Sequence, residues 1–109
     1  MKKMVFVSLP MRGCSDEDIV VRQEKIFGDF QAEDPDSLLI NPFKPKTASE
    51  GQITLHEAVG KGDVYWLGAS ISTLSFADVA IFGRGWANSP GCRIEHKVCT
   101  YYGIPKIYM

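Results

Sequence analysis

The sequence has little of several residue types that would place a protein in a class at once. Its 109 residues include three cysteines and two histidines, and neither type clusters with acids at the spacing of a metal site. No apolar run reaches the length of a membrane span, and the one near the start is too short for a secretory signal. Basic charge is not in excess, since 12 basic residues face 13 acidic ones. We therefore expect no metal, no cofactor, no membrane and no nucleic-acid polymer as a partner.

The cysteines are Cys14, Cys92 and Cys99, an odd number without Cys-x-x-Cys spacing. Cys92 and Cys99 would lie on one helix, roughly 10 Å apart along its axis, which is too far for a disulfide. Unpaired thiols are typical of a reducing compartment, so we expect a cytoplasmic protein.

The composition is that of an ordinary globular protein, with 45% hydrophobic and 23% charged residues. We expect one domain over residues 1–109, which is long enough for its own core. Short apolar runs alternate with amphipathic segments. They predict strands at 4–8, 37–41, 78–82 and 105–109, and helices at 15–30, 63–76 and 89–103.

This order predicts a three-layer α/β fold, in which an open parallel sheet has helices on both faces. Right-handed crossovers give the flavodoxin-like strand order 2-1-3-4. Within the helix at 63–76, one stripe should face the sheet, formed by Val64, Leu67, Ile71 and Leu74. The segment 42–62 is too long for a plain connection, so it is functional or carries a short helix near 53–59.

Ligands of such sheets bind beyond the carboxyl ends of the strands, at the switch point between the first and third. The loops "SLPMRGC", "NPF" and "GRGWANSPG" follow the first three strands and should meet at this edge. Asp78 opens the third strand at the opposite edge, so we interpret it as structural.

The helix at 89–103 begins with features of an anion site. Ser89 is the expected N-cap, Pro90 takes the first helical position, and Gly91 follows, which leaves backbone N–H groups free. Arg12 on the first loop would add a guanidinium suited to phosphate or carboxylate. An isolated arginine of this kind is also typical of a solvated loop.

Glu95 lies one turn into the same helix and has no basic partner at helical spacing. Its stripe should hold Cys92, Cys99 and Tyr102, whereas His96 lies about 100° round the helix. Such an acid in a partly apolar crevice suits a nucleophile or general base. A glutamate in an ordinary helix start is the alternative.

Two known site types do not fit this edge. The glycines of "GRGWAN" lack the third glycine and the ribose-binding acid of a dinucleotide fingerprint. A phosphoacceptor receiver needs acids where this chain has "SLP" and "FGR". Three roles stay open for Trp86, namely packing within the domain, a subunit contact and stacking on a base.

Three stretches, "VFVSLPMRG", "LLINPF" and "ADVAIFGRGWANSPGCRIEHKVCTYYGI", together resemble the DUF4406 family. That family is related to the nucleoside 2-deoxyribosyltransferase and 2′-deoxynucleoside 5′-phosphate N-hydrolase superfamily. The resemblance spans nearly the whole chain. Its most specific part is the spacing S-x-G-x-x-x-E of Ser89, Gly91 and Glu95.

The resemblance implies that Glu95 attacks the anomeric carbon of a deoxyribonucleoside and displaces the base. It also implies that Ser89 and Arg12 hold a 5′-phosphate. The expected substrate-binding residues are Ser8, Pro10, Met11, Arg12, Gly13, Asn41, Trp86, Ser89 and Gly91. The expected partner is a small-molecule nucleotide or nucleoside. The relatives also imply a homo-oligomer, a dimer or larger, with contacts through Trp86, Tyr101, Tyr102 and 42–62.

The sequence departs from those enzymes at two positions. Those enzymes carry an aspartate that assists the leaving base eight residues before the aspartate that opens the third strand. In this sequence the second aspartate is Asp78, and the position eight residues before it holds Ser70. Pro10 stands where the N-hydrolase loop has a phosphate-binding serine. Loss of the aspartate removes a proton transfer worth about 10²–10⁴ in rate. Two functions therefore stay open, namely N-glycosidic cleavage or exchange on a deoxynucleoside monophosphate, and a binding module for nucleotides or nucleotide sugars without turnover.

Overall fold

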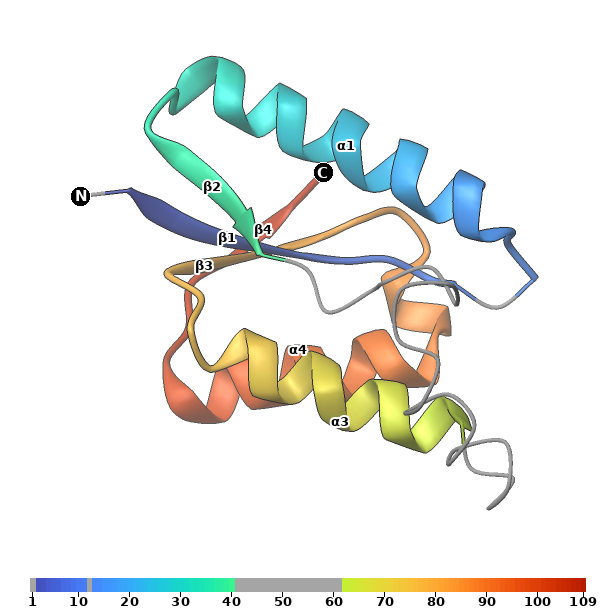
Figure 1. Cartoon of the computed structure of the whole chain (residues 1–109). Coiled ribbons are helices and arrows are strands. Elements are labelled where there is room, and N and C mark those ends of the chain that lie inside the picture. Colours follow the sequence, from blue (N-terminus) through green and yellow to red (C-terminus); the bar gives the residue numbers. More distant parts are fainter. Residues whose placement is uncertain (1, 12, 41–61) are drawn as a thin grey trace.

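The computed structural model describes residues 2–11, 13–40 and 62–109. The strands of this part are β1 (Lys3–Ser8), β2 (Ser37–Ile40), β3 (Val79–Phe82) and β4 (Lys106–Tyr108). Its helices are α1 (Asp16–Glu33), α3 (Gly62–Leu74), the short 3₁₀ helix η2 (Trp86–Asn88) and α4 (Pro90–Tyr102). The strands form one parallel sheet in the order β2-β1-β3-β4 (Figure 1). The three-layer α/β fold and its strand order are confirmed.

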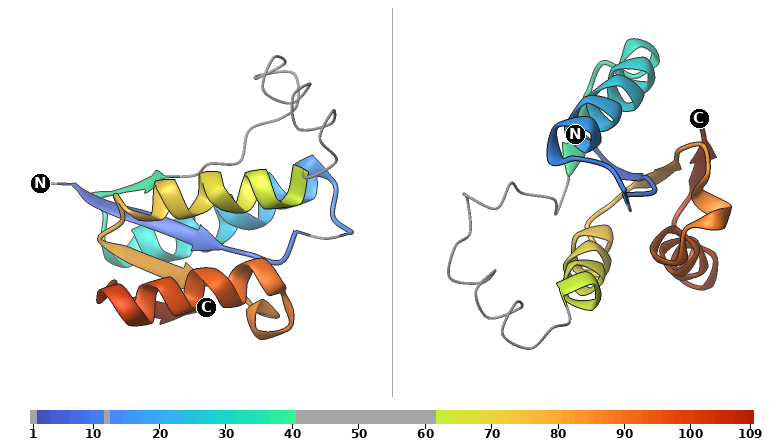
Figure 2. Two further views of the ribbon diagram at one scale, coloured as in Figure 1. Left: turned by 90° about the horizontal axis from the view of Figure 1, so that it is seen from below. Right: turned by 90° about the vertical axis from the view of Figure 1, so that its right-hand side faces the viewer.

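The two faces of the sheet have different covers. Helix α1 lies alone on one side, and α3 and α4 lie together on the other (Figure 2). Because side chains alternate along a strand, β1 supplies both cores. Val5 and Val7 pack toward α1, where Phe30 meets them, whereas Phe6 packs with Leu74 toward α3 and α4. Each of these large buried side chains contributes about 1.5–3 kcal/mol of apolar burial.

The register of the central strands decides which residues reach the carboxyl edge together. Ser8, the last residue of β1, lies opposite Phe82, the last residue of β3, and Phe82 lies opposite Tyr108 of β4. The pairing runs one step further, because Gly83 N–H donates to the Ser8 carbonyl at 2.9 Å. The loops after β1 and β3 therefore leave the sheet at one level and side by side.

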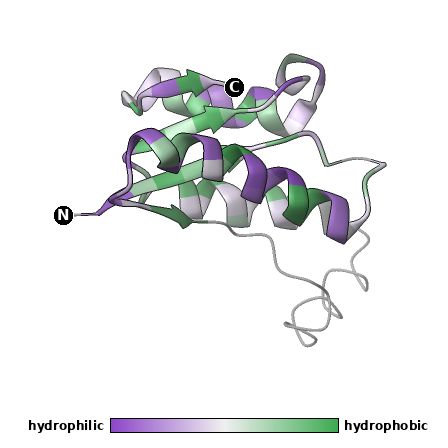
Figure 3. Ribbon diagram, turned by 90° about the horizontal axis from the view of Figure 1, so that it is seen from above, coloured by the Kyte–Doolittle hydropathy of each residue, from purple (hydrophilic) through white to green (hydrophobic). Residues whose placement is uncertain are grey.

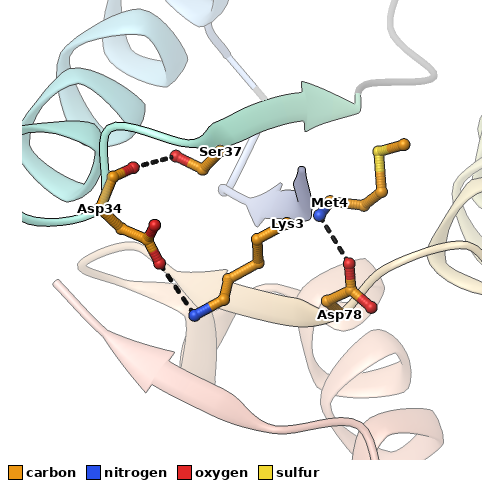
Figure 4. A network of polar contacts seen from close by, with 5 residues as sticks. All are labelled: Lys3, Met4, Asp34, Ser37 and Asp78. Carbon is orange, nitrogen blue, oxygen red and sulfur yellow. Dashed lines mark hydrogen bonds and ion pairs between the residues drawn. The ribbon is translucent and has the colours of Figure 1, made fainter. Parts of the chain in front are cut away.

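A network of polar contacts joins the strands at the amino edge (Figure 4). The Asp78 carboxylate accepts from Met4 N–H at 2.7 Å, and Asp78 N–H donates to the Met4 carbonyl at 2.8 Å. Lys3 pairs with Asp34 at 2.9 Å, and the Ser37 hydroxyl donates to the Asp34 carbonyl at 2.7 Å. Asp78 is thus a structural residue, as the sequence predicted.

Helix α1 runs three residues further than its predicted end at Phe30. It passes through Gly28 and ends at Glu33, because Asp34 precedes Pro35 and the residue before a proline avoids helical geometry. At its other end Ser15 caps the helix as expected, since its hydroxyl accepts from Asp18 N–H at 3.1 Å.

The predicted stripe of α3 is only partly correct. Leu74 is fully buried, but Val64 is 66% exposed. The first turns of α3 extend past the ends of the strands (Figure 2), so a residue there has no sheet to pack on.

The strands are coloured mainly as hydrophobic, whereas hydrophilic residues are spread along α1 (Figure 3). In the part of the chain that the structure describes, no helix is both long enough and apolar enough to cross a membrane.

Candidate functional site

The first turn of α4 starts as the sequence predicted. Ser89 is the N-cap, and its hydroxyl accepts from Cys92 N–H at 3.5 Å while its carbonyl accepts from Arg93 N–H at 2.9 Å. Pro90 occupies the first helical position, and Gly103 ends the helix with a left-handed φ of 71°. This helix start lies on the same side of the sheet as Phe6 and Ser8, one turn before Glu95.

The centre of the site is a hydrogen bond between two buried side chains that are 87 positions apart in the sequence. The Ser8 hydroxyl donates to Oε1 of Glu95 at 2.6 Å. Ser8 is 1% exposed and Glu95 is 7% exposed. Ser8 ends β1 and faces α4 because it shares the alternation of Phe6. A strand and a helix thus hold the donor and the acid against each other.

Burial raises the pKa of Glu95 above its ordinary value, and hydrogen bonds from Ser8 and Ser70 oppose that rise. Ser70 is the residue at the position where the resemblance placed an aspartate. Within the described residues, Glu95 makes no ion pair. Within the part of the chain that the structure describes, the arrangement is a carboxyl group held by two hydroxyls and uncompensated by a cation. A buried acid of this kind is suited to act as a nucleophile or to carry a proton.

Cys92 is a second buried group next to this carboxylate. Burial raises the pKa of its thiol, hydrogen bonds with Ser8 and Ser89 lower it, and the nearby Glu95 charge adds to the rise. The charge of Arg22 acts in the opposite direction. The Cys92 thiol is thus subject to opposing charges, from Glu95 on its own helix and from Arg22 on the helix that covers the other face of the sheet.

The predicted stripe of Glu95 needs one correction. Cys92 and Cys99 are buried with it, and burial raises the pKa of Cys99 to about 11. Tyr102, however, is 80% exposed. It stands seven residues after Glu95, and a straight helix drifts by about 20° over that distance. It is also the last residue of α4, where the packed face ends. The three cysteines are free thiols.

Trp86 belongs to an aromatic cluster beside the site. Its indole stacks on the His96 ring, with centroids 4.1 Å apart and planes at 13°, and it also packs on Phe82 at 5.5 Å. His96 Nε2 lies 2.7 Å from the Tyr108 hydroxyl. Burial and the charge of Lys106 lower the pKa of His96. His96 thus lies off the Glu95 face, as expected. The packing role of Trp86 is observed, and stacking on a base stays a prediction.

The loops after β1 and β3 approach closely, as expected of two loops at one edge. A Cβ on Gly83 would overlap the Leu9 side chain, and one on Gly85 would lie 3.4 Å from Pro10 Cγ. Gly85 also has a φ of 90°, which favours glycine. Pro10 and the third-strand loop are therefore in contact.

The other expected binding residues are placed as follows. Met11 and Gly13 lie on the loop after β1, where Cys14 N–H donates to the Met11 carbonyl at 3.1 Å and Gly13 has a φ of 81°. Among the described residues, a Cβ on Gly91 would have one near neighbour, Leu67 Cδ1 at 4.0 Å. Arg12 and Asn41 lie outside the described residues, as does the segment 42–61.

The structure adds Arg22 of α1 to the residues around this edge. Its Nη1 donates to the Pro10 carbonyl at 3.2 Å and lies 3.6 Å from Cys14 Sγ. The sequence signal for this role is weak, because Asp18 stands four residues earlier and offers an ordinary surface pair. No such ion pair forms within the described residues.

A separate hollow of about 220 Å³ lies on the solvent face of α4, lined by Pro90, Arg93, Ile94 and Lys97. It is on the side of the helix away from Glu95 and plays no part in the site. Among the described residues, no three His, Cys, Asp or Glu side chains are placed to hold a metal ion.

Comparisons with protein-family models, curated proteins and solved structures find no match to this chain. The family resemblance therefore stays a prediction, and the site is interpreted from its own geometry.

Proposed function

We propose that this protein cleaves or exchanges the N-glycosidic bond of a deoxynucleoside monophosphate or related nucleotide, with Glu95 as the nucleophile. The observation that carries the proposal is the buried Glu95 carboxyl, held by the Ser8 hydroxyl at the carboxyl edge of the sheet. Among the described residues this acid has no cation in an ion pair with it, and burying an acid in that way has a cost that is typical of a group kept for chemistry.

The proposed reaction has two steps. A Glu95 carboxylate oxygen forms a bond to the anomeric carbon, and the bond from that carbon to the base nitrogen breaks. The base takes the electron pair and a proton from water. Water, or a second base, then attacks the anomeric carbon and releases the Glu95 carboxylate. The hydroxyls of Ser8 and Ser70 orient the carboxylate for the first attack.

Ser70 makes the proposed enzyme a slow one. Its hydroxyl is a hydrogen-bond partner of Glu95 and is not an acid for the leaving base. The proton must then come from water, so base release is slower by a factor of about 10²–10⁴ than with an acid at this position. The same observation favours a second candidate, a module that binds a nucleotide or nucleotide sugar and leaves it intact.

The start of α4 is the proposed place for the phosphate, with the Ser89 hydroxyl and the N–H groups of the first turn as donors. Arg12 keeps its predicted role as the guanidinium partner. We also propose a homo-oligomer, for which the exposed side chains of Tyr101 and Tyr102 are a suitable contact surface.

The test is release of free base from a panel of deoxynucleoside monophosphates, followed by chromatography, for wild type and Glu95→Gln. The amide keeps the shape of the side chain but cannot attack. Glu24→Gln is the matched control, because Glu24 is an exposed glutamate on α1. We expect release by wild type and the control and none by Glu95→Gln. Equal traces from wild type and Glu95→Gln would exclude the reaction.

Thermal unfolding with the same nucleotides separates the second candidate. A nucleotide that raises the unfolding temperature and is recovered intact supports the binding module. If nucleotides, nucleosides and sugar phosphates all leave the unfolding temperature unchanged, both proposals are wrong.

A further inference from the structure

We infer that Arg22 is a positioning residue of this site, which fixes the loop after β1 from the other face of the sheet. The inference rests on the proposed function for its effect on substrate. It concerns residues 9–14, of which 9–11 and 13–14 are described.

Arg22 contacts both ends of this loop with one nitrogen. Nη1 donates to the Pro10 carbonyl at 3.2 Å and lies 3.6 Å from Cys14 Sγ. The two contacts are four positions apart in sequence, so one nitrogen of Arg22 links the two ends of the loop. A hydrogen bond from a charged donor is roughly twice as strong as a neutral one, which suits it to hold a backbone carbonyl.

The described residues of the loop have little else to hold them. Leu9 is anchored in the core, but the residues after it are only partly buried or exposed. Their internal bonds are the turn from Cys14 N–H to the Met11 carbonyl at 3.1 Å and a weak thiol contact from Cys14 to the Pro10 carbonyl at 4.0 Å. Proline has no N–H to contribute. Without Arg22, the loop would be tied mainly by one turn.

The position of the loop matters because it forms one wall of the site. Pro10 comes two residues after Ser8 and faces Gly85 of the loop after β3. One side chain of α1 therefore reaches the region where the two loops meet.

A lysine could not replace this contact fully. The guanidinium is a planar fork with fixed donor directions, whereas an ammonium group is a point charge on a flexible stem. We expect Arg22→Lys to hold the Pro10 carbonyl alone and to restore part of the wild-type behaviour. Arg22→Met keeps the apolar stem and removes every donor.

The first measurement is hydrogen exchange of backbone amides in the free protein. In Arg22→Met the amides of Gly13 and Cys14 should exchange at least about tenfold faster than in wild type, and in Arg22→Lys by less. Protection of residues 5–8 of β1 should not change, which shows that the fold is kept. Lys25→Met, an exposed position on the same helix, is the control and should leave the loop unchanged. Unchanged exchange at Cys14 in Arg22→Met overturns the inference.

The second measurement is steady-state base release from deoxynucleoside monophosphates. Arg22→Met should raise KM about tenfold and change kcat by less than about twofold, with Arg22→Lys between it and wild type. Faster loop exchange with an unchanged KM would give Arg22 a structural role only and overturn the positioning role. If wild type releases no base, the reaction is wrong, while the exchange result still decides whether Arg22 holds the loop. The shift of the unfolding temperature by the same panel of deoxynucleoside monophosphates then replaces KM.

Discussion

The two edges of the sheet treat charged side chains in opposite ways. At the amino edge, Asp34 meets Lys3 at 2.9 Å, and Asp78 accepts a backbone N–H at 2.7 Å near solvent. At the carboxyl edge, Glu95 is buried against hydroxyls, and Arg22 is bonded to a carbonyl and a thiol instead of an acid. The first edge brings acids to donors that strengthen the fold. Within the described residues, neither the acid nor the guanidinium of the second edge forms an ion pair, which costs stability.

The largest expected effect at either edge is on turnover. Glu95→Gln should lower base release by at least about 10³-fold, because loss of a nucleophile removes the covalent route. Asp78→Asn, at the amino edge, should leave release per folded molecule unchanged. The measurement is initial rate per mole of folded protein, with the folded fraction taken from circular dichroism. An equal fall in both variants would remove the distinction between the edges.

The next effect is on stability at the amino edge. Asp78→Ala removes the acceptor of the Met4 N–H, so the free energy of unfolding should fall by about 1–2 kcal/mol. Urea unfolding followed by circular dichroism measures it. A change below the error of that measurement would mean that water replaces the carboxylate at no cost.

A somewhat smaller effect with the opposite sign is expected at the carboxyl edge. Burial raises the pKa of Glu95 in the folded protein, so at a pH between the unfolded and folded values the folded state holds the extra proton. Stability from this group is therefore present at low pH and is lost as pH rises through that interval. At neutral pH, Glu95→Gln should be more stable than wild type by about 1 kcal/mol.

Acidification should reduce the difference between Glu95→Gln and wild type, as urea unfolding at a series of pH values will show. Base release by wild type should fall over the same interval, since the protonated carboxyl cannot attack. A stability difference that grows on acidification would contradict the raised pKa.

The smallest effect is expected from the ion pair at the amino edge. Lys3→Ala should change the free energy of unfolding by about 0.5 kcal/mol or less, because both partners are partly exposed and the pair is screened by salt. Urea unfolding at low and high salt provides the check. A loss above about 1 kcal/mol would show that this pair holds β1 more firmly than its exposure indicates.

Sequence periodicity was sufficient to predict the sheet and the edge of the sheet at which the candidate site lies. Buried strands alternate with helices, and right-handed crossovers leave one strand order for that pattern. The start and the end of α4 were equally predictable, because Ser89 and Pro90 at the start and Gly103 at the end are local signals that need no tertiary partner. The loops after β1 and β3 meet for the same topological reason, and the loop "NPF" lies outside the described residues.

The contacts inside the site needed the register and the helix placement. Ser8 was expected near the ligand, but its bond to Glu95 follows from β1 ending level with Phe82 and α4 lying over that point. Val64 and Tyr102 were both predicted on the packed face of a helix and are both exposed, for one reason. Periodicity shows which face of a helix is packed, but it does not show where the sheet beneath that helix ends. Arg22 was missed because its partners are a backbone carbonyl and a thiol, and neither can be identified from sequence spacing.

The 87 positions between Ser8 and Glu95 also have a consequence for how the site is made. During synthesis Ser8 emerges 87 residues before Glu95. The central strand β1 must wait for β3, so the sheet has a high contact order and completes late. A nascent or truncated chain that lacks α4 holds only half of the hydrogen bond. The proposed activity would therefore be present only in chains that have been synthesised and folded through α4. A chain without a folded α4 could not act on a nucleotide.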